Sequence, residues 1–209
     1  MDKEVYSYKQ RGDTCAVVCM MMVLEYYNII KKSNWYDERR FYKIYGSKYI
    51  AGTPFSALAY HLSKNGLNTT IYHSSKHLFE NKGTLSEYNF KLAMDEYKEY
   101  LKYAKESGTK VVNGIEINTA LLIKKIQTGN FIIVAGQINE YYHAILIIGY
   151  ENNHFIVCDP LYKNKVIRTT EEIEKFIDTD IGKWFITVND KKWFIKIVLF
   201  IKILFRFKK

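Results

Sequence analysis

The sequence contains little that imposes covalent or rigid structure, since its 209 residues include only three cysteines and two prolines. The odd number of cysteines argues against a disulfide framework. The opening MDKEVYSYKQ lacks the apolar stretch of a secretory signal, and no apolar run reaches the roughly 20 residues that span a bilayer. We therefore expect a reducing, cytoplasmic location in which a thiol is available for chemistry.

Acidic residues are absent from the C-terminal residues 191–209, and this accounts for most of the net charge of +9. Seven of the 31 Lys and Arg residues lie there, which leaves 24 basic residues against 22 acidic ones. Because the excess is confined to one end and no nucleic-acid-binding motif is present, we expect no nucleic-acid partner. The 48% hydrophobic content is typical of a globular protein, and the length suits one domain.

Two interpretations of residues 191–209 stay open, because basic residues there interrupt aliphatic and aromatic ones. As an amphipathic helix, the segment would bind an anionic membrane surface and hold the protein peripherally at the inner face of the membrane. As a last strand or helix, it would instead complete the core. We predict a domain over 1–190 followed by a basic, hydrophobic tail.

The order of the predicted elements indicates an α+β fold, with helices first and an antiparallel sheet second. Helices are predicted at 15–30, 53–65, 91–105, 119–127 and 169–177. Strands are predicted at 67–72, 131–137, 143–150, 154–159 and 183–188. The least regular part, 73–118, is expected to be a variable helical insertion.

Cys15 is the candidate nucleophile because it stands at the start of a predicted buried helix. Unpaired N–H groups and the helix dipole lower the pKa of a cysteine in that position, and its own N–H can face an oxyanion. Gln10, five residues upstream, could add a side-chain amide donor to the same oxyanion.

His143 is the best placed of the five histidines to act as the base, because it opens a predicted strand. The following strand ends at Asp159, so a hairpin turning near Asn152 and Asn153 would bring the two side chains together. A carboxylate there would orient the imidazole and stabilise its charge. Taken singly, each residue also has a structural interpretation, as a core thiol, a strand-end histidine or an Asp-Pro turn.

Two motifs make the pattern more specific: Gln10-x4-Cys15-Ala-x2-Cys19-x6-Tyr26-Tyr27 and His143-x15-Asp159-Pro160. They resemble those of the double-glycine leader peptidases, cysteine peptidase family 39, which process bacteriocins. The resemblance implies a papain-like fold and a peptide or protein substrate, with an exporter as an open partner and no cofactor. It also implies the roles of nucleophile for Cys15, general base for His143, orienting carboxylate for Asp159 and oxyanion donor for Gln10.

Three departures from that family pattern leave the substrate open. Ala16 and Asn28 stand where the family has glycine, and Asn tolerates similar backbone angles. The segment 73–118 is longer than its counterpart and resembles the broader peptidase-39-like proteins. Acyl transfer through the same thioester, and a non-catalytic peptide-docking domain, are alternatives to hydrolysis. Docking relatives have typically lost the cysteine or the histidine, and both are present here.

A zinc site is the main competing use of the cysteines. Cys15 and Cys19, with His73 and His77, would provide a ligand set. We do not expect it, because Cys19 falls inside the core helix and 53 residues separate the pairs. The remaining candidates are expected to be structural: Cys158 as a core thiol, and His61 and His154 as surface residues.

Overall fold

The computed structural model describes residues 4–75, 85–180 and 182–190. The predicted tail at 191–209 lies outside them, so its binding to a membrane stays a prediction. The described helices are α1 (Cys15–Tyr26), α2 (Trp35–Tyr45), α3 (Phe55–Lys64), α4 (Glu87–Glu106), α5 (Thr119–Gln127) and α6 (Thr170–Ile177). The described strands are β1 (Leu67–His73), β2 (Lys110–Val112), β3 (Phe131–Ile138), β4 (Tyr141–Glu151), β5 (His154–Cys158), β6 (Val166–Thr169) and β7 (Trp184–Asp190).

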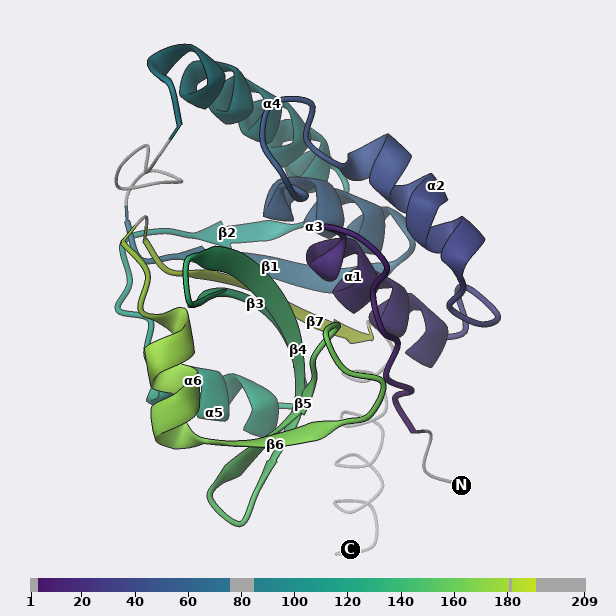
Figure 1. The fold of residues 1–209 in the computed structure, drawn as a ribbon, viewed down its shortest axis with the longest axis vertical. Helices are drawn as coiled ribbons and strands as arrows, with labels where there is room; N and C mark the ends of the chain where they lie inside the picture. Colours follow the sequence, from purple (N-terminus) through teal and green to yellow (C-terminus); the bar gives the residue numbers. More distant parts are fainter. Residues whose placement is uncertain (1–3, 76–84, 181, 191–209) are drawn as a thin grey trace, which may run out of the picture.

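The strands form one seven-stranded sheet with the order β2-β1-β7-β3-β4-β5-β6. Helices α1 and α3 pack on one face, with α2 and α4 outside them, and α5 and α6 cover the other face (Figure 1). The expected α+β fold is confirmed, as is the helix carrying Cys15 packed on a sheet carrying His143 and Asp159. One pair departs from the antiparallel expectation, because β2 runs parallel to β1.

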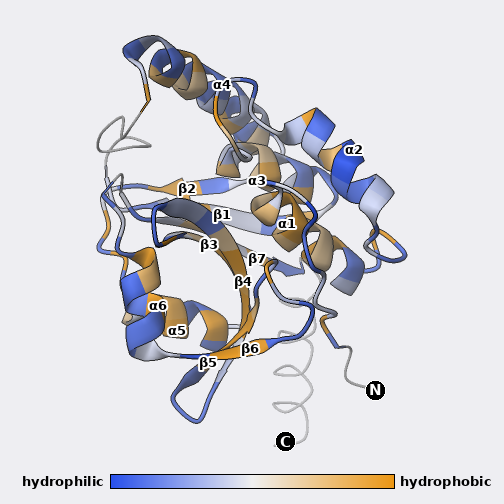
Figure 2. Cartoon of the chain, viewed as in Figure 1, coloured by the Kyte–Doolittle hydropathy of each residue, from blue (hydrophilic) through white to orange (hydrophobic). Residues whose placement is uncertain are grey.

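Helix α1 is the most deeply buried element, as its nearly uniform apolar sequence requires. All residues from Ala16 to Leu24 are buried, and most have no exposed surface. The helix is mainly orange in Figure 2, whereas α2 is mainly blue. It ends at Tyr26, four residues before the predicted end, because Asn28 adopts a left-handed φ of 58°. Asparagine tolerates this angle better than most residues, as expected from the sequence.

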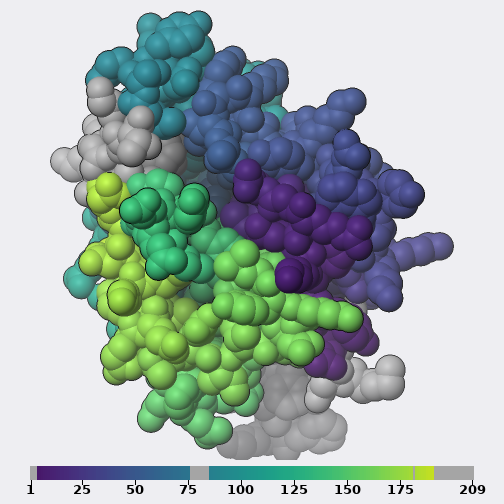
Figure 3. All heavy atoms as spheres, viewed as in Figure 1, coloured from purple at the N-terminus to yellow at the C-terminus, as the bar shows by residue number. Residues whose placement is uncertain are grey.

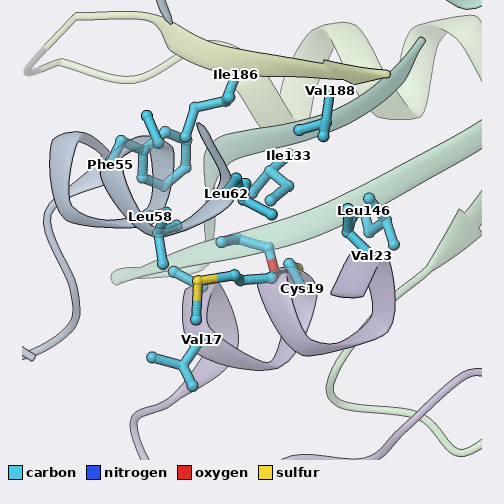
Figure 4. Packing of buried hydrophobic residues seen from close by; sticks show 14 of the residues in the cluster. Val17, Cys19, Val23, Phe55, Leu58, Leu62, Ile133, Leu146, Ile186 and Val188 are labelled. Atoms are coloured by element: carbon cyan, nitrogen blue, oxygen red, sulfur yellow. Dashed lines mark hydrogen bonds between the residues drawn. The ribbon is translucent and has the colours of Figure 1, made fainter. Parts of the chain in front are cut away.

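The core on this face joins α1 and α3 to the central strands. Val23 of α1 lies near Leu146 of the sheet and Leu62 of α3 lies near Ile133, whereas Val17 lies on the far side of α1 (Figure 4). The buried Cys19 contributes to the same cluster, and its Sγ lies 3.5 Å from the carbonyl oxygen of Ala144. Helix α1 therefore packs directly against β4.

Three described elements are missing from the sequence prediction: α2, β2 and β6. The described part of the predicted insertion 73–118 includes α4 and β2, and both join the domain. Helix α4 packs on α3, and β2 extends the sheet beyond β1. One buried contact fixes α4 to the sheet, since the Tyr97 hydroxyl lies 2.8 Å from Nε2 of His73.

Candidate active site

Cys15 is the first residue of α1 and is partly exposed, with its thiol free. The preceding Thr14 occupies the N-cap position but makes no capping bond with its side chain. Its hydroxyl instead lies 3.3 Å from the carbonyl oxygen of Gly12 and 2.5 Å from Oε1 of Glu38. The Thr14 side chain therefore caps none of the backbone N–H groups in the first turn of α1, and these groups favour negative charge near Cys15.

His143 and Asp159 form a buried pair at the open end of the β4–β5 hairpin. Nε2 of His143 lies 2.7 Å from Oδ1 of Asp159, and the two residues are only 7% and 2% exposed. Strands β4 and β5 pair antiparallel, with an irregularity in register between Ile147 and Gly149. The hairpin predicted from the sequence therefore brings these two side chains into direct contact.

The pKa of His143 reflects this environment. Burial lowers it, but hydrogen bonds with Asp159 and Cys15, together with the charges of both groups, raise the pKa from 6.5 to about 9. Because Nε2 is engaged by Asp159, Nδ1 is the nitrogen left for Cys15. The imidazole thus lies between a thiol and a carboxylate, and it carries a proton at neutral pH.

Gln10 lies beside this pair because its backbone N–H donates to the carbonyl oxygen of Pro160 at 2.8 Å. Its side-chain Nε2 donates to the carbonyl oxygen of Gly12 at 2.7 Å. Oε1 of Gln10 is buried and finds no hydrogen-bond partner within the described part of the chain. In Figure 3 the purple N-terminal segment lies against the green segment that follows β5, in agreement with the bond to Pro160.

Helix α6 supports the imidazole from the other side. The ring of Phe176 stands edge-on to that of His143, with centroids 6.4 Å apart. This approach depends on Gly136, the β3 residue paired with His143, because a Cβ there would overlap the backbone and ring of Phe176. Sequence reasoning missed both residues, and the only local signal is the glycine inside a strand.

Glu38 is a further residue that the sequence interpretation missed. It has no exposed surface, and its carboxylate accepts hydrogen bonds from the segment that precedes Cys15. A usable signal was present, since Asn34 caps α2 through its side chain. In the resulting helix, Glu38 shares the buried face with Phe41 and Tyr45 at the i, i+3 and i+7 positions.

The other predicted roles have different outcomes. Cys158 is fully buried, which confirms its expected place in the core. His61 is half-buried rather than fully exposed, because its Nδ1 lies 2.7 Å from the Tyr45 hydroxyl in a partly buried contact. His154 is half-buried at the turn between β4 and β5, where Nδ1 lies 2.7 Å from the carbonyl oxygen of Asn152.

The competing zinc set gains no support from the described residues. His73 is engaged on both ring nitrogens, by Tyr97 and by Asn113. His77 lies outside the described residues. Within 4–75, 85–180 and 182–190, no group of three or more His, Cys, Asp or Glu side chains is arranged to hold a metal ion. Nor is any helix in these ranges long and apolar enough to cross a membrane.

A family model of known proteins covers most of the chain. The family model described as "Peptidase_C39 like family" matches residues 3–188. The chain belongs to this family. The bacteriocin-peptidase resemblance drawn from the two sequence motifs is thereby confirmed at the level of the family.

A similar solved structure is the peptidase domain of Streptococcus ComA, described as a bi-functional ABC transporter involved in a quorum-sensing pathway. The identity is 14% over 90% of this chain and 100% of that domain, with a TM-score of 0.49. Comparison with curated proteins finds no match. The papain-like assignment therefore rests on membership of the C39-like family and on the arrangement of the described helices and strands.

Proposed function

We propose that this C39-like protein is a cysteine peptidase that cleaves a peptide substrate, with leader-peptide processing as its biological use. The observation that carries the proposal is the buried His143–Asp159 pair, whose imidazole interacts with Cys15 at the start of α1. A peptidase needs a nucleophile, a base and an orienting group in this relation. Membership of the C39-like family supports the same reaction class.

The first chemical step forms a thioester. An imidazolium stabilises a neighbouring thiolate, so the sulfur of Cys15 attacks the scissile carbonyl carbon and the carbonyl electrons move to oxygen. The backbone N–H of Cys15 and the amide of Gln10 are the proposed donors to that oxyanion. When the oxyanion collapses, the C–N bond breaks and the proton on His143 passes to the leaving amine.

The second step releases the acyl group. A water molecule gives a proton to the neutral His143 and attacks the thioester carbon, and the C–S bond then breaks. The products are a carboxylic acid and the regenerated thiolate–imidazolium pair. Asp159 holds the imidazole in one tautomer throughout, because its carboxylate engages Nε2.

The test compares wild type with Cys15→Ala on a defined mixture of synthetic peptides, with cleavage sites read by mass spectrometry. We expect products from wild type and none from the variant. Cys158→Ala serves as the control, because it removes a thiol and leaves Cys15 intact. If wild type leaves the peptides intact, and wild type and Cys15→Ala bind them equally, the result would favour a docking domain.

Adding hydroxylamine to the same reaction separates hydrolysis from acyl transfer. Hydroxylamine captures a thioester as a hydroxamic acid, whose mass differs from that of the carboxylic acid. A peptidase gives mainly the acid when hydroxylamine is absent. A transferase gives little acid until an amine acceptor is supplied.

A further inference from the structure

The segment between the N-terminus and α1 is fixed by one carboxylate. Oε1 of Glu38 accepts from the backbone N–H of Arg11 at 2.8 Å and from the Thr14 hydroxyl at 2.5 Å. Oε2 accepts from the Tyr8 hydroxyl at 3.0 Å. The three donors are spaced three residues apart, and they flank Gln10 and lead directly into Cys15.

Glu38 is a buried group whose donors are all neutral. It has 0% exposure, so its carboxylate is removed from water and depends on these hydrogen bonds. Tyr8 remains a donor because burial, and then the hydrogen bond and charge of Glu38, raise the pKa of Tyr8 to about 12. An ionised carboxylate only accepts, and three donors suit it.

The opposite side of the same segment is also held. Gln10 N–H donates to Pro160, which directly follows Asp159, and the N–H of Tyr8 contacts Sδ of Met22 at 3.4 Å. The path of residues 8–14 therefore runs between Glu38 of α2 and the turn after β5. Losing the carboxylate would free one side of the segment while the bond to Pro160 remains.

We propose that Glu38 is a positioning residue for the active site, which sets the placement of Cys15 and Gln10 by holding residues 8–14. The proposal rests on the peptidase function argued above. It assigns Glu38 no contact with the substrate. Displacing catalytic groups by about 1 Å can cost on the order of 10²-fold in rate, so weakening this support should lower turnover more than binding.

The test uses Glu38→Ala, Glu38→Gln and the control Glu96→Gln in the full chain. Glu96 is matched because its carboxylate also holds a loop, through the Ser47 hydroxyl and the N–H of Lys48, but on α4. The measurements are kcat, KM, the thermal midpoint, and the iodoacetamide rate at Cys15 from pH 5 to 10. Gln keeps one acceptor oxygen, so Glu38→Gln should recover part of the loss.

We expect Glu38→Ala to lower kcat about 10²-fold with KM changed less than about threefold, and to move the half-maximal alkylation pH upward. Glu96→Gln should match wild type in kcat and in alkylation. Because Glu38→Ala removes the acceptor of the Tyr8 hydroxyl and the Arg11 N–H and one acceptor of the Thr14 hydroxyl, it could fail to fold, and Thr14→Val and Tyr8→Phe provide milder tests. Each removes one donor hydroxyl and should shift kcat and alkylation in the same direction, by less.

A lower thermal midpoint with wild-type kcat and a wild-type alkylation profile, in Glu38→Gln and Thr14→Val alike, would overturn the proposal. Glu38 would then only stabilise the fold. The outcome is separable from that of the peptidase proposal. If wild type cleaves no peptide but the alkylation profile still shifts in the Glu38 variants and not in Glu96→Gln, the peptidase proposal fails and the positioning of Cys15 by Glu38 stands.

Discussion

The backbone N–H of Gln10 donates a 2.8 Å hydrogen bond to the carbonyl oxygen of Pro160. Pro160 directly follows Asp159, so this one bond joins the segment leading into Cys15 to the segment carrying the carboxylate of the pair. The two halves of the candidate site come from segments that lie far apart in the sequence. Their alignment depends on contacts of this kind rather than on the hairpin alone.

Gln10→Ala should lower kcat by roughly 10²-fold with little change in KM, because an oxyanion donor acts only in the transition state. The backbone bond to Pro160 does not need the side chain, so the thermal midpoint should change little. Steady-state kinetics and a melting curve on the same preparation check both points. An unchanged kcat would assign the oxyanion role to backbone N–H groups alone.

Cys15 should be the only thiol that iodoacetamide labels quickly at pH 6.5. Cys19 and Cys158 have no exposed surface, and burial raises the pKa of both thiols, that of Cys158 to about 11. Cys15 is partly exposed and faces a protonated imidazole. Peptide mapping after short labelling decides the matter, and faster modification of either buried cysteine would refute the assignment.

Asp159→Asn should lower turnover by on the order of 10²-fold or more and change the pH profile. In wild type, His143 must hold a proton for the leaving amine, so activity should be lost as pH rises through about 9. The hydrogen bond with Asp159 is the largest single influence that raises that pKa, so replacing the carboxylate should move the alkaline limb to lower pH. If the alkaline limb of the Asp159→Asn profile lies at the same pH as in wild type, Asp159 does not control the pKa of His143.

The stability of the protein should decrease on acidification below pH 6.5, with His61 as one cause. Burial, and then the charges of Lys64 and Arg40, lower the pKa of His61 to about 4. The unfolded chain therefore binds a proton between pH 6.5 and 4 that the folded chain does not, and unfolding is favoured there. As the pH is lowered from 6.5 to 4, the melting temperature of His61→Gln should fall less than that of wild type. The control variant is His154→Gln.

The contribution of His143 to folding stability has the opposite dependence on pH, and it acts over a different pH range. Its folded pKa lies above 6.5, so its stabilisation is present below pH 6.5 and is lost as pH rises through about 9. A His143→Gln variant should therefore lose less stability than wild type between pH 6.5 and 9. Below pH 6, the stability of this variant should change with pH as that of wild type does.

Gly136→Ala should destabilise the fold by about 1–3 kcal/mol, because the added Cβ would push Phe176 and α6 off the sheet. Activity should fall as well, since Phe176 packs against the ring of His143. Gly12→Ala is the control for stability, because a Cβ at Gly12 would meet open space. Chemical denaturation measures the difference, and equal midpoints for both variants would contradict the packing argument.

Local patterns sufficed to predict several elements. The apolar run of α1 and the β-branched run from Phe131 gave the correct type of element because burial and propensity agreed there. The candidate site followed from two local facts, that Cys15 starts a helix and that a short turn joins β4 to β5. These are relations within short stretches of sequence.

Long-range relations were not predictable in the same way. The three-residue β2 exists only because β1 offers a parallel edge, and the half-exposed β6 only because β5 pairs with it. The hydrogen bonds of Glu38 with residues 8–14 depend on the folded-back path of that segment, and the closeness of Gly136 to Phe176 depends on where α6 docks. A single sequence does not encode these contacts as a pattern.

The strand order has a consequence for synthesis on the ribosome. Strand β7, the last described, lies between β1 and β3 and pairs with both. Until residues 184–190 emerge from the exit tunnel, β1–β2 and β3–β6 have no strand to join them, so α3, which packs on β1 and β7, is not linked through the sheet to the strands β3 and β4 that support α1. Because β7 alone joins β1–β2 to β3–β6, the complete seven-stranded sheet would assemble only late in synthesis.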